Sequence, residues 1–339
     1  MRAFVVTGPR QSSVVEVEPP VAAAGQVVVD VERVGVCGTD VEFFTGEMEY
    51  LKQGHASFPI RLGHEWCGTI TATGSGVDRA MIGRRTTGDT MLGCGHCRRC
   101  AAGYHHVCDD RYEIRVRGGW PGALAEQLAV PATALHLLPD SVDAMAGALV
   151  EPGGNALRCL WASQVSAGDR VLVLGPGTIG LLVAQFAKAA GAEVHLMGLP
   201  GPAIDFARTQ AVDGVWTRAE LPEVLFDAVV DATNGQGLPA LALELVEPGR
   251  RVVYIGLANT PSMIDSRTLV LKDVTAVGIL GASAGLEGAI EHYASGRVDP
   301  RPLVAATVGL HEVADVLAGS RPTDSGNGPK IHVDPRSGA

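Results

Sequence analysis

Four of the chain's seven cysteines lie within fifteen residues, in the stretch GCGHCRRCAAGYHHVC that ends at Cys108. They are Cys94, Cys97, Cys100 and Cys108, separated by two, two and seven residues. In a reducing cytosol, clustered cysteines more often hold a metal than form disulfides. Four thiolates arranged tetrahedrally make the usual structural zinc site, so we predict structural zinc here; an iron–sulfur cluster or unrelated buried thiols are the alternatives. Because four sulfurs leave no position for a substrate, the reaction centre must lie elsewhere.

The residues around these cysteines fit a site of bound thiolates. Gly95 and Gly103 ease the turns that bring the sulfurs together. Four thiolates on one dication leave a local charge near −2, and Arg98, Arg99 and Arg111 are close enough in sequence to offset part of it.

Three separate segments supply a second set of metal donors. They are GVCGTD with Cys37, RLGHEWCG with His64 and Glu65, and ALVEPGG with Glu151. A lone histidine or cysteine is more often a packed core residue. Together, one thiolate, one imidazole and one carboxylate provide three protein ligands and leave a fourth position for water or substrate, as catalytic zinc requires.

The spacing around His64 resembles the signature of the zinc-dependent medium-chain alcohol dehydrogenase family. Gly63-His64-Glu65 is followed by two residues and Gly68, by five residues and Gly74, and by two residues and Val77. The upstream Cys37-Gly38-Thr39-Asp40 and the four-cysteine stretch match the same family, and with the nucleotide motif below the resemblance covers nearly the whole chain.

This resemblance implies roles for the donor residues. Cys37, His64 and Glu151 would bind the catalytic zinc, with water in the fourth position. Glu65 is similar to a family glutamate that can approach the metal as an alternative ligand.

The resemblance also implies a proton relay. Thr39 matches the hydroxyl residue that receives the substrate proton, and Asp40 matches a carboxylate that orients the metal-bound histidine. The alternative for Asp40 is a turn or helix-cap residue. Many family members have a histidine two residues after this aspartate, whereas this chain has Glu42, as some sugar dehydrogenases do.

After the third ligand, Gly153, Gly154 and Asn155 replace the bulkier residues often found in the family. Two interpretations stay open, a wider pocket near the zinc or a tight turn.

A nucleotide-binding turn is indicated from Val171 onward, where the sequence reads VLVLGPGTIGLLVAQFAKAAGAEV. Gly175, Gly177 and Gly180 form G-x-G-x-x-G between an apolar β-branched run and a helical pattern. The first glycine permits the turn, the second lets the pyrophosphate approach the backbone, and the third allows the helix to pack closely on the strand. Thr178 and Ile179 complete the predicted coenzyme-binding turn.

The sequence contains neither of the usual residues that select between NAD and NADP. About 20 residues past the first glycine, an acidic residue usually binds the ribose of NAD, or an arginine accommodates the 2′-phosphate of NADP. Gly198 and Leu199 stand at these places, and Asp205 and Arg208 come later, on the expected surface of a helix. We expect NAD(P), with a slight preference for NAD, because no residue would pair with the extra phosphate.

The predicted fold class is α/β, with a β-rich, GroES-like catalytic domain and a doubly wound parallel-sheet Rossmann domain. Residues 1–152 form the catalytic domain, completed by 296–339, and residues 153–295 form the nucleotide domain. The tail is expected to contain a helix, a loop over 322–329 and a final strand that rejoins the first domain. Cys67 and Cys159 have no ligand-like partners and are expected to be buried packing residues. The further predicted elements of the nucleotide domain are strands over 192–198, 226–233, 250–257 and 273–280, and helices over 201–210 and 238–246.

Composition excludes several functional classes. With a net charge of −10, the chain lacks the clustered Lys and Arg that nucleic-acid binding needs. The first twenty residues contain no signal-peptide core, and no apolar segment is long enough to cross a membrane, so we expect a cytoplasmic protein.

The resulting hypothesis is reversible oxidation of a secondary alcohol of a polyol, sugar or cyclitol to a ketone, by hydride transfer in a cleft between the domains. Two zinc ions per chain and a homodimer or homotetramer are expected. A simple alcohol or an amino alcohol such as threonine is the alternative substrate. The remote alternative is a non-catalytic zinc- and nucleotide-binding protein.

Overall fold

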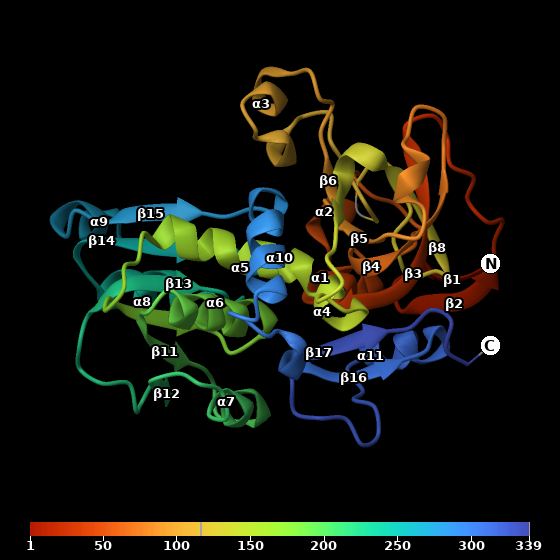
Figure 1. Ribbon diagram of the computed structural model, residues 1–339. Helices are drawn as coiled ribbons and strands as arrows, with labels where there is room; N and C mark the ends of the chain where they lie inside the picture. Colours follow the sequence, from red (N-terminus) through yellow and green to blue (C-terminus); the bar gives the residue numbers. More distant parts are fainter. Residues whose placement is uncertain (116, 339) are drawn as a thin grey trace. The chain divides into compact units, whose positions relative to one another are not determined.

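The computed structural model describes residues 1–115 and 117–338, which divide into two compact units (Figure 1). Unit 1 comprises residues 1–151, 299–326 and 330–339, and unit 2 comprises residues 152–298 and 327–329. The C-terminal segment therefore contributes to the same unit as the N-terminal half of the chain.

Unit 1 is built on a mostly antiparallel sheet with the strand order β16-β17-β3-β4-β5-β9. Strand β8 also pairs with β3. Its long central strand β3 (Gln26–Val36) is mostly buried, because its valines face the core shared with β4 (Glu65–Thr73). Strand β17 (Lys330–Val333) lies antiparallel beside β3 and thereby brings the end of the chain next to the first metal-ligand segment. The other strands of the unit are β1 (Arg2–Gly8), β2 (Gln11–Glu16), β5 (Arg85–Gly88), β6 (Met91–Leu92), β7 (Tyr112–Glu113), β8 (Gln127–Pro131), β9 (Leu135–Leu137) and β16 (Val304–Val308).

Short helices connect these strands. They are α1 (Gly38–Thr45), α2 (Glu49–Lys52), α3 (Arg98–Ala101), α4 (Ala144–Ala148) and α11 (Val313–Leu317). Helix α3 lies in the cysteine-rich stretch, which projects from the rest of unit 1 as a separate lobe (Figure 1).

Unit 2 contains a six-stranded parallel sheet with the order β12-β11-β10-β13-β14-β15. In sequence order this is 3-2-1-4-5-6, the doubly wound arrangement, so the predicted fold class is confirmed. After its first residue, central strand β10 (Arg170–Leu174) is a continuous buried apolar run, as expected for a parallel strand covered on both faces. The other strands are β11 (Glu193–Met197), β12 (Gly214–Trp216), β13 (Phe226–Asp231), β14 (Val246–Tyr254) and β15 (Thr275–Gly278).

Helices pack on this sheet through apolar faces. Helix α6 (Thr178–Ala189) packs on β10 and β11, and α8 (Leu238–Leu245) packs on β13 and β14. Phe186 of α6 stacks on Tyr293 of α10 (Leu286–Ala294), with ring centroids 6.1 Å apart. The remaining helices are α7 (Pro202–Ala207), α9 (Ser266–Leu271) and α5 (Val150–Ser163), whose first two residues belong to unit 1.

Two predictions concern the remaining cysteines and the C-terminal segment. Cys67 and Cys159 are buried free thiols, as predicted. In the tail, the helix is confined to α11, and the preceding VAATV forms β16, which the sequence did not predict as a strand. This short, alanine-rich segment becomes a strand because it pairs in parallel with β17.

Within the described part of the chain, every helix is too short or too polar to span a lipid bilayer.

Candidate functional site

The open donor cluster forms where two paired strands of unit 1 begin and end. Strand β3 ends one residue before Cys37, and β4 begins one residue after His64. Because Gly35 lies opposite Glu65 in this antiparallel pair, the two donor segments are adjacent. The Sγ atom of Cys37 lies 3.8 Å from Nδ1 and 3.7 Å from Nε2 of His64. Donor atoms of Cys37, His64 and Glu65 all lie within 4.8 Å of one another.

The third predicted ligand comes from a distant segment. Glu151 lies at the start of α5, and its Oε2 is 4.0 Å from Nε2 of His64. The Glu151 side chain is 8% exposed and the His64 side chain 14% exposed. The fold thus brings Cys37 and Glu151 each close to His64, whereas the three donors whose atoms all lie within 4.8 Å of one another are Cys37, His64 and Glu65.

Burial controls the protonation of this cluster. Burial, with Arg115 adding to its effect, lowers the pKa of His64 to about 3, so the imidazole is neutral, which is the form that binds metals. Burial also raises the pKa of the Cys37 thiol well above its ordinary value, and the nearby Asp40 carboxylate raises it further. A bound cation would reverse this preference, because coordination deprotonates a thiol outright.

Asp40 occupies the first turn of α1 and is completely buried. Its Oδ2 accepts a hydrogen bond of 3.0 Å from the Cys37 backbone N–H, and its Oδ1 accepts one of 3.4 Å from Gly63 N–H. Asp40 is therefore the N3 residue of a capping box whose N-cap is Cys37, which agrees with the cap alternative, and its part in orienting the histidine stays a prediction. The described residues show no hydrogen bond between Asp40 and His64. Its cap bonds instead tie the Cys37 turn to the residue before His64.

A buried arginine compensates the charge of Asp40. Nη1 of Arg115 lies 3.2 Å from Oδ1 of Asp40, and the two side chains are 3% and 0% exposed. Burial alone would raise the pKa of Asp40, but the Arg115 charge, together with His64 and the hydrogen bonds from Cys37, holds that pKa below its usual value. The Arg115 guanidinium also lies 5.3 Å from the ring centroid of Phe43, a cation–π distance. The sequence analysis missed Arg115, for which no motif or periodicity gave a signal.

Glu65 is held by a buried lysine. Nζ of Lys330 donates to Oε2 of Glu65 over 2.6 Å and to the Val36 carbonyl oxygen over 3.0 Å. Burial favours the neutral form of each partner, whereas their mutual attraction favours the charged pair. For the lysine, burial is outweighed by Glu65, Cys37 and Asp40 acting together, and its pKa is raised above its ordinary value.

Gly35 makes this ion pair possible. A Cβ atom on Gly35 would overlap Oε2 of Glu65, so the carboxylate crosses the central strand through the space that the glycine leaves. Lys330, like Arg115, was missed by the sequence analysis. The only available signal was a charged residue in the otherwise apolar strand KIHV.

The predicted relay residues lie on α1. Thr39 is half-buried and is two residues from Cys37. Partial burial raises the pKa of Glu42, an effect that Arg115 partly offsets. Both side chains therefore lie on the helix that follows Cys37. Their role in proton transfer stays a prediction.

The four lobe cysteines form the second donor cluster. Their sulfur atoms lie within 4.8 Å of one another, and no disulfide joins any cysteine of the described chain. Backbone N–H groups of Cys97 and Cys100 point to the sulfurs of Cys94 and Cys97 over 3.3 and 3.5 Å. Hydrogen bonds from the backbone at His96 and Cys97 lower the pKa of Cys94 to about 6. This geometry suits bound thiolates.

The lobe turns as expected, but its arginines have other partners. Gly95 and Gly103 have φ angles of 79° and 82°, a region that glycine adopts without strain. Arg99 pairs with Asp109 over 2.5 Å, and Arg111 pairs with Glu113 over 2.5 Å. Cys97 and Cys108 also raise the pKa of Arg99, after the larger effect of Asp109, so the compensation of the thiolate charge by these arginines stays a prediction.

The predicted nucleotide turn joins β10 to α6 in unit 2. Gly175 follows β10 with a φ angle of 98°, and Gly177 is the N-cap of α6 and has open space around it. A Cβ on Gly180 would overlap the Gly175 carbonyl oxygen, so this glycine permits the close turn. Thr178 and Ile179 are the first two residues of α6, where backbone N–H groups favour a phosphate.

Neither coenzyme-selecting residue type stands at the end of β11. Gly198 follows the strand directly, and Leu199 is 85% exposed. Asp205 and Arg208 lie on the surface of the α7 region and pair with each other over 3.1 Å.

The tight-turn interpretation of Gly153, Gly154 and Asn155 is wrong, because all three lie within α5. A Cβ on Gly153 would overlap the Tyr293 hydroxyl, and one on Gly154 would lie 3.0 Å from Ala282. The two glycines let α5 pack closely against the region of α10. The local sequence does not reveal that these glycines are needed for close packing, because the residues they pack against are about 130 residues away in the chain.

Comparison with known proteins agrees with this geometry. Residues 23–140 match the alcohol dehydrogenase GroES-like domain. The chain is 31% identical over 334 residues to a 2-dehydro-3-deoxy-L-galactonate 5-dehydrogenase of Pseudoalteromonas atlantica, covering 94% of each. It is also 31% identical to an L-threonine 3-dehydrogenase of Idiomarina loihiensis, covering 78% of this chain and 80% of the relative.

Solved structures show the same fold over the whole chain. An alcohol dehydrogenase of Escherichia coli CFT073 in complex with NADH has a TM-score of 0.90 and 25% identity, covering 98% of this chain and 99% of that one. A zinc-binding dehydrogenase of Sinorhizobium meliloti 1021 bound to NADP has a TM-score of 0.89 and 25% identity, with the same coverage. With the converging donors and the nucleotide turn, these relationships show that the chain belongs to the zinc-dependent medium-chain alcohol dehydrogenase family.

Proposed function

We propose that this chain is a zinc-dependent, NAD(P)-linked dehydrogenase that oxidises a secondary alcohol of a polyol, sugar or cyclitol to a ketone. The observation that supports the proposal is the approach of Cys37 and of Glu151, from two distant segments, to the largely buried His64. Dehydrogenation of an alcohol needs a site that stabilises an alkoxide and a carrier that accepts a hydride. The two units supply the residues for these tasks.

The donor set of the open cluster fits zinc. Sulfur, imidazole nitrogen and carboxylate oxygen are all zinc ligands, and three protein ligands are typical of catalytic sites. Zinc held by Cys37, His64 and Glu151 would act as a Lewis acid that lowers the pKa of the substrate hydroxyl. Zinc in the four-cysteine lobe would be structural, which makes two ions per chain.

Residues around the cluster keep it in a state able to bind metal. Arg115 neutralises Asp40, and Lys330 neutralises Glu65, so the two carboxylates do not add uncompensated charge beside the ligands. Lys330 also holds the Glu65 carboxylate, which supports its assignment as an alternative rather than a permanent ligand. Thr39 is the proposed acceptor of the substrate proton.

In unit 2, Gly175, Gly177 and Gly180 with Thr178 and Ile179 are the proposed pyrophosphate-binding turn. The coenzyme accepts the hydride. We keep the slight preference for NAD, because Gly198 and Leu199 offer no cation to a 2′-phosphate.

The substrate class is supported by the sugar-acid relative, which is a 2-dehydro-3-deoxy-L-galactonate 5-dehydrogenase. The threonine dehydrogenase relative supports an amino alcohol as the alternative. We further propose a homodimer or homotetramer in the cytoplasm, on the basis of family resemblance and unpaired cysteines.

A substrate screen tests the proposal. Purified protein is incubated with polyols, sugar acids, cyclitols, simple alcohols and threonine, separately with NAD and NADP, and the absorbance of reduced coenzyme is followed. Reduction that depends on a secondary-alcohol polyol or sugar is the expected result. Turnover confined to threonine or to primary alcohols would contradict the substrate class.

Metal analysis tests the non-catalytic alternative. About two zinc ions per chain are expected of the enzyme, whereas one ion would support a structural protein with only the lobe occupied.

A further inference from the structure

A pocket of about 300 Å³ lies in unit 1 and is lined by residues other than the donors of the two clusters. Its wall includes the rings of Pro20, Trp120 and Pro121, and it also includes Gln26 and Arg61. None of the proposed metal ligands or relay residues lines it. Its volume is at the lower end of the range for small-molecule sites.

Arg61 is the ionisable residue among those that line this pocket. Its Nε atom is buried without a hydrogen-bond acceptor, and no carboxylate of the described residues forms an ion pair with its guanidinium. Burial lowers the pKa of Arg61 to about 10. By contrast, the buried cations Arg115 and Lys330 each have a carboxylate within 3.2 Å.

A partly buried charge without a counter-charge is less stable than a paired one, so a group that neutralises it binds favourably. A guanidinium presents a planar fork of N–H donors that matches a carboxylate. Because the wall contains one positive charge, a ligand with one negative charge neutralises it. This favours a monocarboxylate over a phosphate dianion. Aromatic and proline rings favour an apolar or aromatic body on the same molecule.

The geometry of the wall fits such a ligand. Trp120 donates its Nε1–H to the Ala129 carbonyl over 3.0 Å, which fixes the indole ring. Gly118 and Gly119 have φ angles of 76° and 75°, and a Cβ on Gly119 would meet nothing within 4 Å. The backbone beside Trp120 therefore leaves open space next to the ring.

We propose that this pocket binds a small monocarboxylate, whose carboxylate pairs with Arg61 and whose apolar body packs against Trp120. The site is separate from the proposed alcohol-oxidising site and takes a different chemical class of ligand.

Isothermal titration calorimetry of the zinc-loaded full chain with benzoate tests this site. Saturable binding is expected, with at least a tenfold loss of affinity in Arg61→Met and no binding of the neutral isostere benzamide. Arg84→Met, which removes the same charge from an exposed position, is the matched control and is expected to bind benzoate like the unmodified chain. Inorganic phosphate is expected to bind more weakly than benzoate.

A carboxylate could also bind at the open metal cluster, and a second variant distinguishes that case. Benzoate binding at the pocket persists in Cys37→Ala and is lost in Arg61→Met, whereas binding at the metal shows the opposite pattern. Without ligand, Arg61→Met is expected to unfold at the same or a higher temperature, because it removes a half-buried charge that has no carboxylate partner among the described residues. Equal benzoate affinity in Arg61→Met and the unmodified chain, or no binding to either, would overturn the proposal.

Discussion

The two donor clusters of unit 1 differ in where their residues come from and in how they are surrounded. The lobe takes four sulfurs from residues 94–108, and most of this stretch is half-buried or exposed. The open cluster draws its donors from positions 37, 64 and 151, and two buried ion pairs, Asp40–Arg115 and Glu65–Lys330, lie around it. A closed site can thus be made by local turns, whereas an open one needs the surrounding fold to hold and compensate its charges.

The strongest test of this contrast is Cys37→Ala. Loss of the sulfur donor should remove the zinc that stabilises the alkoxide, so turnover should fall by about 10³-fold or more. The fold should persist, because the lobe and both cores are untouched. Zinc content should drop from about two ions to about one per chain, measured by plasma emission spectrometry beside steady-state kinetics. Full activity in this variant would remove Cys37 from the ligand set.

The second test breaks the charge compensation at the open cluster. Lys330→Met leaves the Glu65 carboxylate buried without its partner, and we expect the free energy of unfolding to fall by about 3–5 kcal/mol. Adding Glu65→Gln should recover much of the loss, because it removes the charge. Arg336→Met, which breaks a more exposed pair with Asp30, should cost less than about 1 kcal/mol. Equal losses for Lys330→Met and Arg336→Met in denaturant melts would show that burial adds nothing to the Glu65–Lys330 pair.

The third test concerns the lobe. Cys97→Ser should release the lobe zinc and lower the free energy of unfolding by about 1–3 kcal/mol, because between Cys94 and Cys108 only His106 and Cys108 are buried. Limited proteolysis should cut the lobe faster than in the unmodified chain, while the zinc at the open cluster remains. Unchanged zinc content and unchanged cleavage would count against a structural metal in the lobe.

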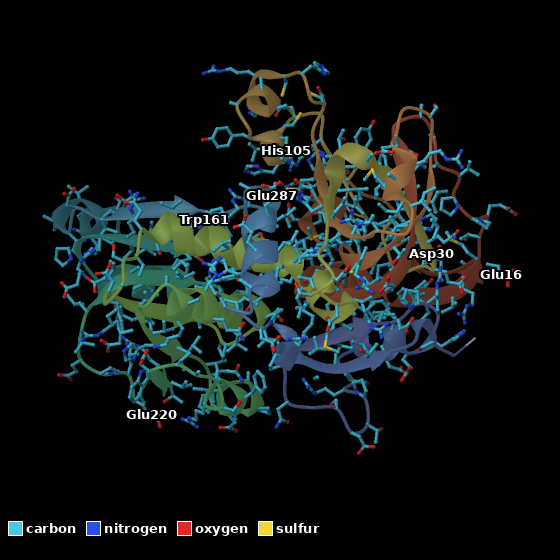
Figure 2. All side chains as sticks on the ribbon, viewed as in Figure 1. Glu16, Asp30, His105, Trp161, Glu220 and Glu287 are labelled. Carbon is cyan, nitrogen blue, oxygen red and sulfur yellow. The ribbon has the colours of Figure 1, made fainter. Side chains whose placement is uncertain are left out.

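The smallest expected effect is a pH dependence beside the lobe. His105, labelled in Figure 2, bonds through Nε2 to Oδ2 of Asp89 over 2.6 Å, and this bond raises the pKa of His105 above its ordinary value of 6.5. The stabilisation is complete below pH 6.5 and is lost as the pH rises through the raised pKa. With the His105 side chain 36% exposed, we expect less than about 1 kcal/mol. Thermal melts of His105→Gln should lack this pH-dependent loss; an identical profile in both proteins would exclude His105 as its source.

Much of the architecture could be predicted from patterns that are local in the sequence. The glycines at 175, 177 and 180 follow an apolar strand and open a helix, so the parallel sheet and its nucleotide turn were predictable. The four-cysteine spacing predicted a compact donor cluster for the same reason. These features depend on neighbours a few residues apart, where chain geometry leaves few choices.

The sequence alone, with the family pattern it carries, determined the fold class, the nucleotide turn and the residues that could bind zinc. Only the tertiary structure decided that Glu65 crosses Gly35 to reach Lys330, that Asp40 pairs with Arg115, and that Gly153 makes room for Tyr293. In each case the partner is at least 75 residues away in the chain. Whether a buried charge is paired, and whether a glycine is needed, depends on which distant strand or helix packs there, and local sequence periodicity contains no information about that neighbour.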